Sequence, residues 1–534
     1  MVLAAQVRAD DVAWAAGGPA SVESAPDGAM DPIAALIEQR LALRSAAADE
    51  TTALLYLGRG YRPLWGDPER ASALLSAVEQ AATHGLDPQD FRPQRLRMLR
   101  AVPDDPVERV DRELVLTDTL AELVRQLRYG KVDPRTLYRE WNYTPVPNPY
   151  QRAGELARVL EAADLGAAIE AQAPAVPLYR ALRRALATYQ SLAALGDWPK
   201  VPGGSTLRPG QSSVRVPALR ARLQADGEEG LDAADPARFD ALLAAAVERF
   251  QERHGLEADG IVGAQTLRAL NTSPAERARQ VRANLERLRW VAADLEGDRL
   301  YVDIVGYRAD LVLGGRSAWS SKVIVGRPTR KTPSLRDSVV NLVLNPKWVV
   351  PPTILREDVI PGVVHNPDYL ESHRMHVVDR SGQTIDPASI DWSGARRGGF
   401  PYMIVQASGA QGSLGRIKFS LSNRYAIYLH DTNARALFGR AERALSSGCV
   451  RVQQPEELAV LLLDDADHWG PAALAAALDS GRTRTLPVGR EVRVLLHYST
   501  AALDASGRLL LRNDIYDHDA GILDALAAGP GGGH

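Results

Sequence analysis

The chain contains a single cysteine, Cys449, among its 534 residues. One cysteine cannot form an intramolecular disulfide, so the fold is expected to be stable without covalent cross-links. No apolar stretch approaches the roughly 18 residues that cross a bilayer, and we therefore expect no membrane span. The 63 Lys and Arg residues nearly balance the 66 Asp and Glu residues, and a net charge of −3 offers no field that would attract nucleic acid.

The start of the sequence lacks the marks of a signal peptide. Residues 1–11 have neither a basic segment nor an apolar core of the required length. Two interpretations stay open: the protein is cytosolic, or its targeting segment has been removed. Residues 1–30, which are rich in Ala, Gly, Asp and Ser, are expected to form a flexible leader, and the glycine-rich last residues are expected to be disordered.

The length and composition predict several globular domains. At roughly 150 residues per domain, the chain predicts three to four, and 45% hydrophobic with 24% charged residues is typical of globular protein. Helical spacing of apolar residues, broken by proline and glycine, runs through residues 31–200. This predicts a helical scaffold domain, and since it shows no cluster with catalytic or metal-ligand spacing, we expect a structural role.

Residues 205–272 contain a separate pattern of three short helices. Its distinctive segments are 207–210, 247–251 and 254–267, with a turn at 259–263. These segments closely resemble the three-helix peptidoglycan-binding domain, and the resemblance implies a module that attaches to the cell wall. Simple core packing of Phe250 and Leu256 would explain the same residues, so binding stays open.

Beyond residue 284 the apolar spacing changes from 3.6 residues to 2, which predicts a β-rich domain over residues 284–500. Residues 352–412 interrupt this pattern with prolines, glycines, aromatics and short helical pieces. An insertion of that length is typical of a functional lid. Residues 501–534 follow as a C-terminal extension. The predicted fold class is therefore multidomain α+β. Strands are expected at 299–304, 318–325, 339–344, 417–421, 426–430 and 491–498.

The segment around Cys449 is polar and turn-forming, with Ser446, Ser447 and Gly448 before it. A free cysteine is often a small buried hydrophobe. Here, however, the glycine leaves room for a substrate carbonyl to approach and for backbone N–H groups to face it. This favours a nucleophile. A thiol with a pKa of roughly 8.5 needs a nearby base or cation to become reactive, and Arg451 is one candidate.

His430, nineteen positions before the cysteine, is the candidate base. Strand alternation would place Ala426, Tyr428 and His430 on one face of their strand. A surface or strand-end histidine is the competing interpretation. Because the segment between His430 and the thiol is long enough to fold back, we predict a Cys–His dyad.

These residues resemble the active-site motif of the L,D-transpeptidases of the YkuD type. The motif comprises 430–432 and 446–452, and the similarity extends over 284–290, 323–328, 331–333, 345–354 and 413–419. The order of these segments, with the helical region, the module and the insertion, closely resembles the large YcbB subgroup. Shorter members carry a histidine at the position of Ser447, whereas this subgroup also has serine. The group that orients His430 is then unassigned, with a backbone carbonyl as the candidate.

The resemblance implies an acyltransferase that forms 3-3 crosslinks in peptidoglycan. Its thiolate would attack a tetrapeptide stem at diaminopimelate, release D-alanine and pass the acyl group to the amine of a second stem. The insertion would exclude water from the acyl-enzyme. For Trp348, a core position against Pro351 and Pro352 is an equal alternative. The resemblance implies that Cys449 is the nucleophile and His430 the general acid/base. It implies that Gly448 and Ser447, with the backbone of Cys449, form and position the oxyanion site. The residues implied to bind substrate are Tyr428, Arg451 and Trp348.

The same resemblance implies a periplasmic enzyme of cell-wall synthesis and cell shape, with its signal segment absent from this sequence. No cofactor and no metal are expected. The expected partners are peptidoglycan stem peptides and other cell-wall synthesis proteins, without nucleic acid, and carbapenems should acylate Cys449. Two alternatives stay open: a peptidoglycan hydrolase or carboxypeptidase that uses the same Cys–His pair, and a non-catalytic wall-binding scaffold. The acyl acceptor is also open among a stem peptide, a lipoprotein, a D-amino acid and water.

Overall fold

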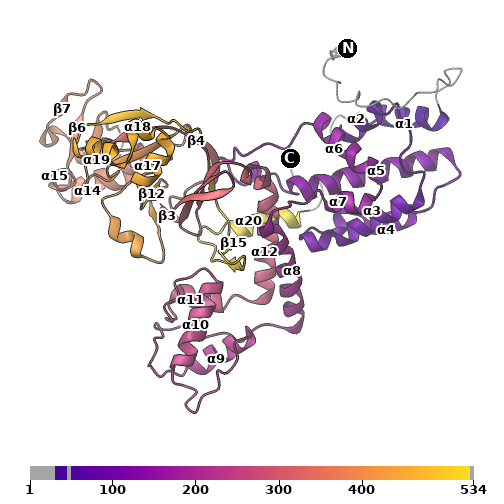
Figure 1. The fold of residues 1–534 in the computed structure, drawn as a ribbon, viewed down its shortest axis with the longest axis horizontal. Coiled ribbons are helices and arrows are strands. Elements are labelled where there is room, and N and C mark those ends of the chain that lie inside the picture. Colours follow the sequence, from indigo (N-terminus) through magenta and orange to yellow (C-terminus); the bar gives the residue numbers. More distant parts are fainter. Residues whose placement is uncertain (1–30, 45–49, 398, 529–534) are drawn as a thin grey trace.

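The computed structural model describes residues 31–44, 50–397 and 399–528, which form a helical region, a three-helix module and a β-rich domain (Figure 1). The predicted multidomain α+β fold is confirmed. The expected leader, residues 1–30, and the last residues, 529–534, lie outside the described residues. In the described part of the chain, no helix is long and apolar enough to cross a membrane.

Capping residues and prolines define where the helices of the helical region begin. Helices α1, α3, α5 and α6 each begin at a proline preceded by Asp or Asn, whose side-chain oxygen accepts a backbone N–H of the first turn. Buried leucines of α3, α5 and α6 form the core of this region. Its helices are α1 (Pro32–Ala42), α2 (Thr51–Gly58), α3 (Pro68–Gln80), α4 (Pro93–Met98), α5 (Pro106–Tyr129), α6 (Pro149–Glu161), α7 (Leu165–Glu170) and α8 (Pro177–Leu195).

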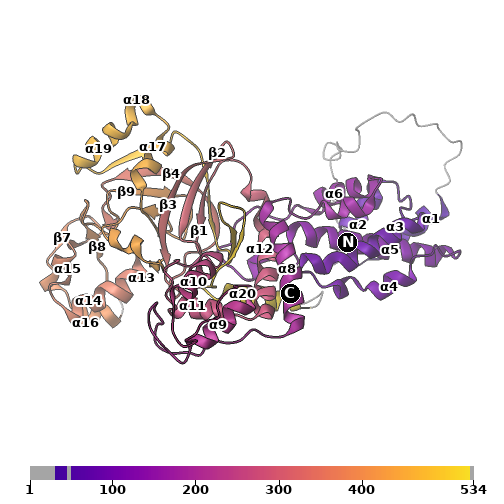
Figure 2. The ribbon, with the colours of Figure 1, turned by 60° about the horizontal axis from the view of Figure 1, so that its bottom comes forward.

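Helix α12 (Pro274–Val291) joins the parts of the molecule and lies beside α8 between the helical region and the β-rich domain (Figures 1 and 2). It is charged yet almost wholly buried, because its ions are paired: Arg287 with Asp519 at 2.7 Å, and Arg289 with Glu286 at 2.7 Å. The predicted domain start, residue 284, lies inside this uninterrupted helix. The C-terminal elements β15 (Ala501–Leu503), β16 (Leu509–Leu511) and α20 (His518–Ala527) contribute to the same core.

The three-helix module consists of α9 (Val216–Ala225), α10 (Ala241–Arg253) and α11 (Ala264–Leu270). Phe250 is fully buried in its core, beside Leu219 and Val247, as the packing interpretation predicts. A short antiparallel bridge between Leu207 and Val262 closes the module. The core packing therefore accounts for the apolar pattern of this segment without reference to a ligand.

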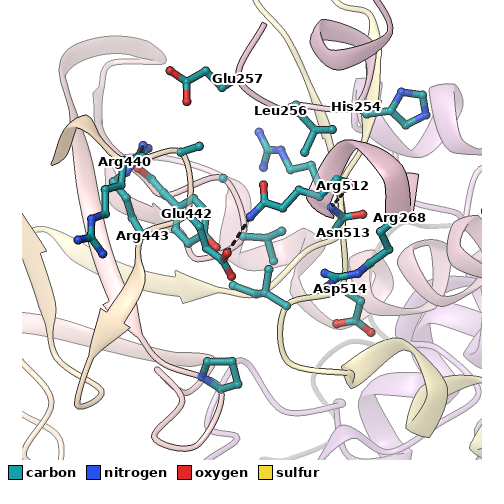
Figure 3. Close-up of a pocket in the computed structure, with 18 of the residues that line it drawn as sticks. His254, Leu256, Glu257, Arg268, Arg440, Glu442, Arg443, Arg512, Asn513 and Asp514 are labelled. Carbon is teal, nitrogen blue, oxygen red and sulfur yellow. Dashed lines mark hydrogen bonds between the residues drawn. The ribbon is translucent and has the colours of Figure 1, made fainter. Parts of the chain in front are cut away.

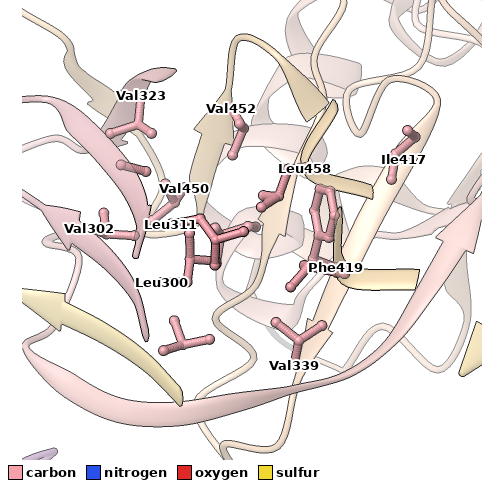
Figure 4. Packing of buried hydrophobic residues seen from close by; sticks show 14 of the residues in the cluster. Leu300, Val302, Leu311, Val323, Val339, Ile417, Phe419, Val450, Val452 and Leu458 are labelled. Atoms are coloured by element: carbon pink, nitrogen blue, oxygen red, sulfur yellow. The ribbon is translucent and has the colours of Figure 1, made fainter. Parts of the chain in front are cut away.

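The β-rich domain is a closed barrel. Its strands pair in the order β3-β12-β10-β9-β4-β14-β1-β2, and β2 pairs with β3 again, so the ring has no free edge. Alternate side chains point inwards and form one apolar core, which includes Leu300, Val450 and Phe419 (Figure 4). The strands are β1 (Arg299–Asp303), β2 (Arg308–Leu313), β3 (Arg316–Gly326), β4 (Leu335–Leu344), β9 (Ile417–Leu421), β10 (Leu429–His430), β12 (Val450–Val452) and β14 (Arg493–His497), with β11 (Ala444–Ser446) on β3 and β13 (Arg484–Pro487) on β4.

Three helices and an inserted subdomain flank the barrel. Helices α17 (Pro455–Leu463), α18 (Ala466–Trp469) and α19 (Pro471–Asp479) follow β12, and Leu458 and Leu462 of α17 join the barrel core. The insertion has its own sheet, in the order β5-β8-β6-β7, which the sequence pattern did not indicate. Its elements are β5 (Trp348–Val349), α13 (Pro352–Ile354), a π-helical turn (Leu355–Val359), α14 (Ile360–His365), α15 (Tyr369–Ser372), β6 (Met375–Val378), β7 (Thr384–Ile385), α16 (Trp392–Arg397) and β8 (Met403–Gln406).

The contact between the helical region and α12 depends on Gly130. Its φ is +92°, and a Cβ there would lie 2.7 Å from Glu286 Oε1 and from Trp290 Nε1. We predict that Gly130→Ala destabilises this contact by about 2–4 kcal/mol through overpacking and backbone strain. Scanning calorimetry of the full chain should show one transition at a lower temperature. Gly154→Ala, in α6 with no atom within 4 Å, is the control and should be neutral or stabilising. Equal transitions in the two variants would contradict the prediction.

Candidate active site

Three neighbouring strands of the barrel carry the polar side chains of the candidate site. In the pairing register, His430 of β10 lies opposite Lys418 of β9 and Arg451 of β12. The residue next to each of them on its strand is buried in the core: Phe419 beside Lys418, Leu429 beside His430 and Val450 beside Arg451. Since side chains alternate between the two faces, the polar residues share the outer face of the barrel.

The thiol joins this outer face through the turn before β12. The Val450 N–H donates to the Tyr428 carbonyl at 3.1 Å, which places Cys449 across from Tyr428. A cavity of about 470 Å³ lies over this face and is covered by the insertion, which contributes Ile354, Val359 and other side chains. Each site residue named from the sequence lines this cavity: Trp348, Tyr428, His430, Ser447, Gly448, Cys449 and Arg451.

The predicted strand 426–430 is wrong in its first half, because only Leu429–His430 forms β10. Ala426 has a left-handed backbone with φ of +57°, and it therefore does not share a strand face with His430. The cause is Asn423, whose side-chain oxygen accepts the N–H groups of Tyr425 and Ile427 and so bends the segment into a turn. The Ala426 carbonyl instead accepts a hydrogen bond from Cys449 Sγ at 3.5 Å.

His430 is buried, with 4% of its surface exposed, and its Nδ1–H donates to the backbone carbonyl of Asp431. The prediction that a carbonyl orients this ring is confirmed. Nε2 is then left as the unprotonated nitrogen. Burial, with the nearby Arg451 guanidinium and the Lys418 ammonium, lowers the pKa of His430 to about 3, although the Asp431 hydrogen bond acts in the opposite direction. The imidazole is therefore neutral at physiological pH and available as a base.

Asp431 holds this arrangement in place; it lies in the motif 430–432, but no role was assigned to it from the sequence. Its buried carboxylate accepts the Arg416 backbone N–H at 2.9 Å and the Arg435 guanidinium at 2.8 Å. Gly415 is required beside it, because its φ is +58° and a Cβ would lie 2.3 Å from Asp431 Oδ2. The signal in the sequence was its place in the motif, next to His430, together with the segment 413–419, whose residues belong to the resemblance but had no assigned role.

Cys449 is partly exposed to the cavity, and burial raises the pKa of its thiol. The backbone and hydroxyl of Tyr428 and the positive charges of Lys418 and Arg451 oppose that shift. The Lys418 ammonium lies 4.4 Å from the centre of the Tyr428 ring. Within the described chain, neither Lys418 nor Arg451 has a carboxylate at ion-pair distance, so two uncompensated cations stand next to the nucleophile candidate. Lys418 was missed because a charge on a strand ordinarily marks a solvated face.

The turn before Cys449 is fixed by hydrogen bonds. Gly448 has φ of +115°, its N–H donates to Ser446 Oγ at 3.1 Å, and its carbonyl accepts the Thr332 hydroxyl at 2.7 Å. Ser446 Oγ in turn donates to the Cys449 carbonyl at 2.6 Å. The Gly448 N–H, expected near the oxyanion site, is thus already engaged. Neither the Ser447 N–H nor the Cys449 N–H has an acceptor among the described residues, so both are free backbone donors of the turn.

Ser447 connects the turn to the insertion through Arg330. Arg330 Nη1 donates to Ser447 Oγ at 3.0 Å, while Nη2 pairs with Asp358 at 2.9 Å and Glu357 at 2.8 Å. Both acids lie in the π-helical turn of the insertion. Arg330 is therefore a single cation that joins the lid to the segment that carries the thiol. Within the described chain, no group of three or more His, Cys, Asp or Glu side chains could hold a metal ion.

A thiol and a neutral buried imidazole that line one cavity beneath an inserted subdomain are typical of enzymes that act through a cysteine nucleophile. Comparison with known families narrows this class. Residues 297–492 match the YkuD family, described as the L,D-transpeptidase catalytic domain. Residues 212–270 match the family described as "Putative peptidoglycan binding domain", and residues 50–186 match a "Scaffold domain". The chain therefore carries a YkuD-type L,D-transpeptidase catalytic domain and a peptidoglycan-binding domain. Membership of the YcbB subgroup stays a prediction.

A curated relative supports the same family. It is the "Putative L,D-transpeptidase" of Haemophilus influenzae, 38% identical over 239 residues, which are 45% of this chain and 48% of the relative. The match thus spans about half the length of that relative. Two solved L,D-transpeptidase structures, from Xylanimonas cellulosilytica and Stackebrandtia nassauensis, are 17% and 14% identical. They cover 55% and 56% of this chain and 99% and 96% of their own, each with a TM-score of 0.18.

The shifted pKa of Cys449 predicts how its reactivity depends on pH. Only the thiolate is alkylated, so the rate of iodoacetamide modification should rise with pH through a midpoint above the ordinary value of about 8.5. Lys418→Met removes a cation that stabilises the thiolate and should raise the midpoint by roughly 0.5–1 unit. Lys200→Met, in an exposed connecting segment, is the matched control. A midpoint below 7, or one that Lys418→Met leaves in place, would count against this view of the site.

The contacts of Arg330 predict that this residue stabilises the folded state of the first part of the insertion. Arg330→Gln should raise amide hydrogen exchange in residues 352–365 about fivefold, which corresponds to ~1 kcal/mol for a partly exposed ion-pair network. Arg356→Gln removes an exposed ion pair to the same acid, Glu357, at 3.1 Å and serves as the control. Because Arg356 does not contact Ser447, its loss should change exchange little. Equal amide exchange in the two variants would contradict the prediction that Arg330 stabilises the insertion by joining it to Ser447.

Proposed function

We propose that the protein is a peptidoglycan L,D-transpeptidase that forms 3-3, diaminopimelate-to-diaminopimelate crosslinks from tetrapeptide donor stems. The observation that carries the proposal is the convergence of Cys449 and His430 on one outer face of the barrel, beneath the insertion. The family match supports the reaction class, and the matched binding domain supports peptidoglycan as the substrate. The family also implies a cell-wall or periplasmic location, and we place the enzyme in the periplasm.

The donor half-reaction uses the neutral imidazole as a base. His430 Nε2 takes the thiol proton while Cys449 Sγ attacks the carbonyl at the L centre of diaminopimelate, forming the C–S bond. The Cys449 N–H is available to the developing oxyanion. When the intermediate collapses, the C–N bond to D-alanine breaks and His430 returns its proton to the leaving amine. The product is a thioester with a free D-alanine.

The unpaired donors of the cavity suit the groups of a stem peptide. Trp348 Nε1 and Arg451 Nε are buried without an acceptor among the described residues. A buried donor without a partner is destabilising, so a substrate carbonyl or carboxylate that accepts these hydrogen bonds gains free energy on binding. Arg451 and Lys418 lack carboxylate partners and would hold the stem's carboxylates. In this proposal Tyr428, whose ring faces the Lys418 ammonium, packs against the peptide.

The acceptor half-reaction needs an amine and the absence of water. The side-chain amine of a second stem attacks the thioester, His430 takes its proton, the new C–N bond forms and the C–S bond breaks to regenerate the thiol. Water would compete at the same carbon. The insertion places Ile354, Val359 and Tyr369 over the cavity, and this cover favours transfer over hydrolysis.

The proposal is tested with purified disaccharide-tetrapeptide and mass spectrometry of the products. We expect a dimer that has lost one D-alanine and is linked between two diaminopimelate residues, and at least a thousandfold less product from Cys449→Ala. Tripeptide without dimer would instead identify a hydrolase that uses the same pair. Full activity of Cys449→Ala would refute both. A carbapenem should add its mass to the intact protein and not to Cys449→Ala, and an active protein without that adduct would contradict this part of the proposal.

A further inference from the structure

A second cavity, of about 670 Å³, lies between the three-helix module, the β-rich domain and the C-terminal segment (Figure 3). It shares no lining residue with the cavity over Cys449. The module contributes residues 254–257, 265 and 268, the barrel contributes the loop 439–443, and the C-terminal segment contributes 512–515 and 517. Two hydrogen bonds link its walls: Gln265 Nε2 of the module donates to Glu442 of the barrel at 2.9 Å, and Asn513 Nδ2 of the C-terminal segment donates to the Gln265 carbonyl at 3.5 Å (Figure 3).

This cleft holds charges of both signs that are not paired with each other. Arg268 and Arg440 are exposed, and within the described chain neither has a carboxylate at ion-pair distance. Glu257 has no basic group at ion-pair distance in the described chain, although the Arg443 guanidinium is near enough to interact with its carboxylate, and the bonded partner of Glu442 is an amide. Charges of opposite sign that could reach one another would normally pair, so their separation leaves room for a ligand that carries both. Such a ligand is zwitterionic.

Tyr307 at the wall of the cleft supports a binding role independently. Its side chain is 8% exposed, and its hydroxyl has no hydrogen-bond partner among the described residues. Its backbone is left-handed, with φ of +54°, an unfavourable conformation for a bulky residue. The Arg443 guanidinium lies 5.2 Å from the centre of its ring and donates to the Tyr307 carbonyl at 3.1 Å. Strain and an unpaired buried hydroxyl at one residue mark a place where a ligand would complete the structure.

The composition of the lining distinguishes a peptide from a glycan. Sugar rings are commonly held against exposed aromatic faces, and the single aromatic residue among the lining residues, Tyr307, is buried. A peptidoglycan stem carries several carboxylates and one free amine, which matches the mixed charges of the cleft. We propose that this cleft binds a second, non-reacting stem peptide of the peptidoglycan substrate, with its carboxylates at Arg268 and Arg440 and its amine at Glu257. The identity of this ligand rests on the proposed function.

The position of the cleft explains what a second stem would contribute. The loop 439–443 continues directly through β11 to the thiol, and from Arg443 to Cys449 the chain advances six residues, which span at most about 20 Å. A peptidoglycan strand that places one stem in the cleft therefore keeps a neighbouring stem close to Cys449. Binding of the second stem becomes an intramolecular event with a high effective concentration. The cleft would thus favour polymeric peptidoglycan over isolated stems.

Binding stoichiometry tests the proposal on the full chain. Titration calorimetry uses Cys449→Ala, which cannot turn over, with disaccharide-tetrapeptide as the probe. We expect two sites per chain, and Arg268→Gln combined with Arg440→Gln should weaken one of them at least about tenfold. The pair Arg62→Gln and Arg95→Gln, two exposed arginines of the helical region, is the matched control and should keep both sites. One site per chain, or two sites unaffected by the cleft variant, would overturn the proposal.

A double-mutant cycle separates the peptide from the sugar and from folding defects. Acetylation of the diaminopimelate amine should weaken binding at the cleft, and Glu257→Gln should abolish that difference. Binding of the disaccharide without its peptide, or an acetylation effect that Glu257→Gln leaves intact, would overturn the assignment. Failure of the proposed function is recognised separately: protein with an intact Cys449 would then produce no crosslinked dimer, whatever the titrations of the cleft show.

Discussion

The parallel pairing of β10 with β12 is the constraint on which the candidate site depends. It sets Leu429 opposite Val450 and His430 opposite Arg451. The two apolar side chains of the first pair therefore both point into the core, and the two polar side chains of the second pair both point out of it. A slip of one residue would turn His430 inwards and Leu429 outwards, which the core could not tolerate. Because the ring of strands is closed, β10 is held on both sides and has no edge along which to slip. Core packing therefore fixes the relative position of base and thiol.

Burial shifts the pKa values of the two titrating groups of this site in opposite directions, and both shifts favour the neutral form. It raises the pKa of Cys449 and lowers that of His430, so the resting pair is a neutral thiol beside a neutral imidazole. In the proposed reaction, negative charge arises on sulfur and then on the substrate oxygen only when substrate reacts. Lys418 and Arg451 are already in place, without carboxylate partners in the described chain, to stabilise that charge. The cations thus act on the reacting state more than on the resting one.

The alternation of apolar residues was sufficient to predict strands β1, β3, β4, β9 and β14, because their pattern is local, but it indicated neither β2 nor β12, which close the barrel beside β3. Contacts made across long separations were not predictable. Arg330 reaches Ser447 over 117 positions, and nothing near either residue indicates the other. Ala426 was misplaced for a local reason, since an asparagine side chain competed with the strand for backbone N–H groups. The roles of the seven site residues still rest on chemistry and resemblance.

The segment from Arg440 to Cys449 gives the two cavities a common element. At one end its side chains line the cleft against the module, and at the other it carries the thiol beneath the insertion. The module is held against the barrel partly by Arg512, which pairs with Asp303 and would lie 3.0 Å from a Cβ at Gly255 and 2.4 Å from a Cβ at Gly306, so a side chain at either glycine would displace it. Module, barrel and C-terminal segment are therefore packed as one unit at this point, and a ligand seated in the cleft contacts the same stretch of backbone that positions the nucleophile.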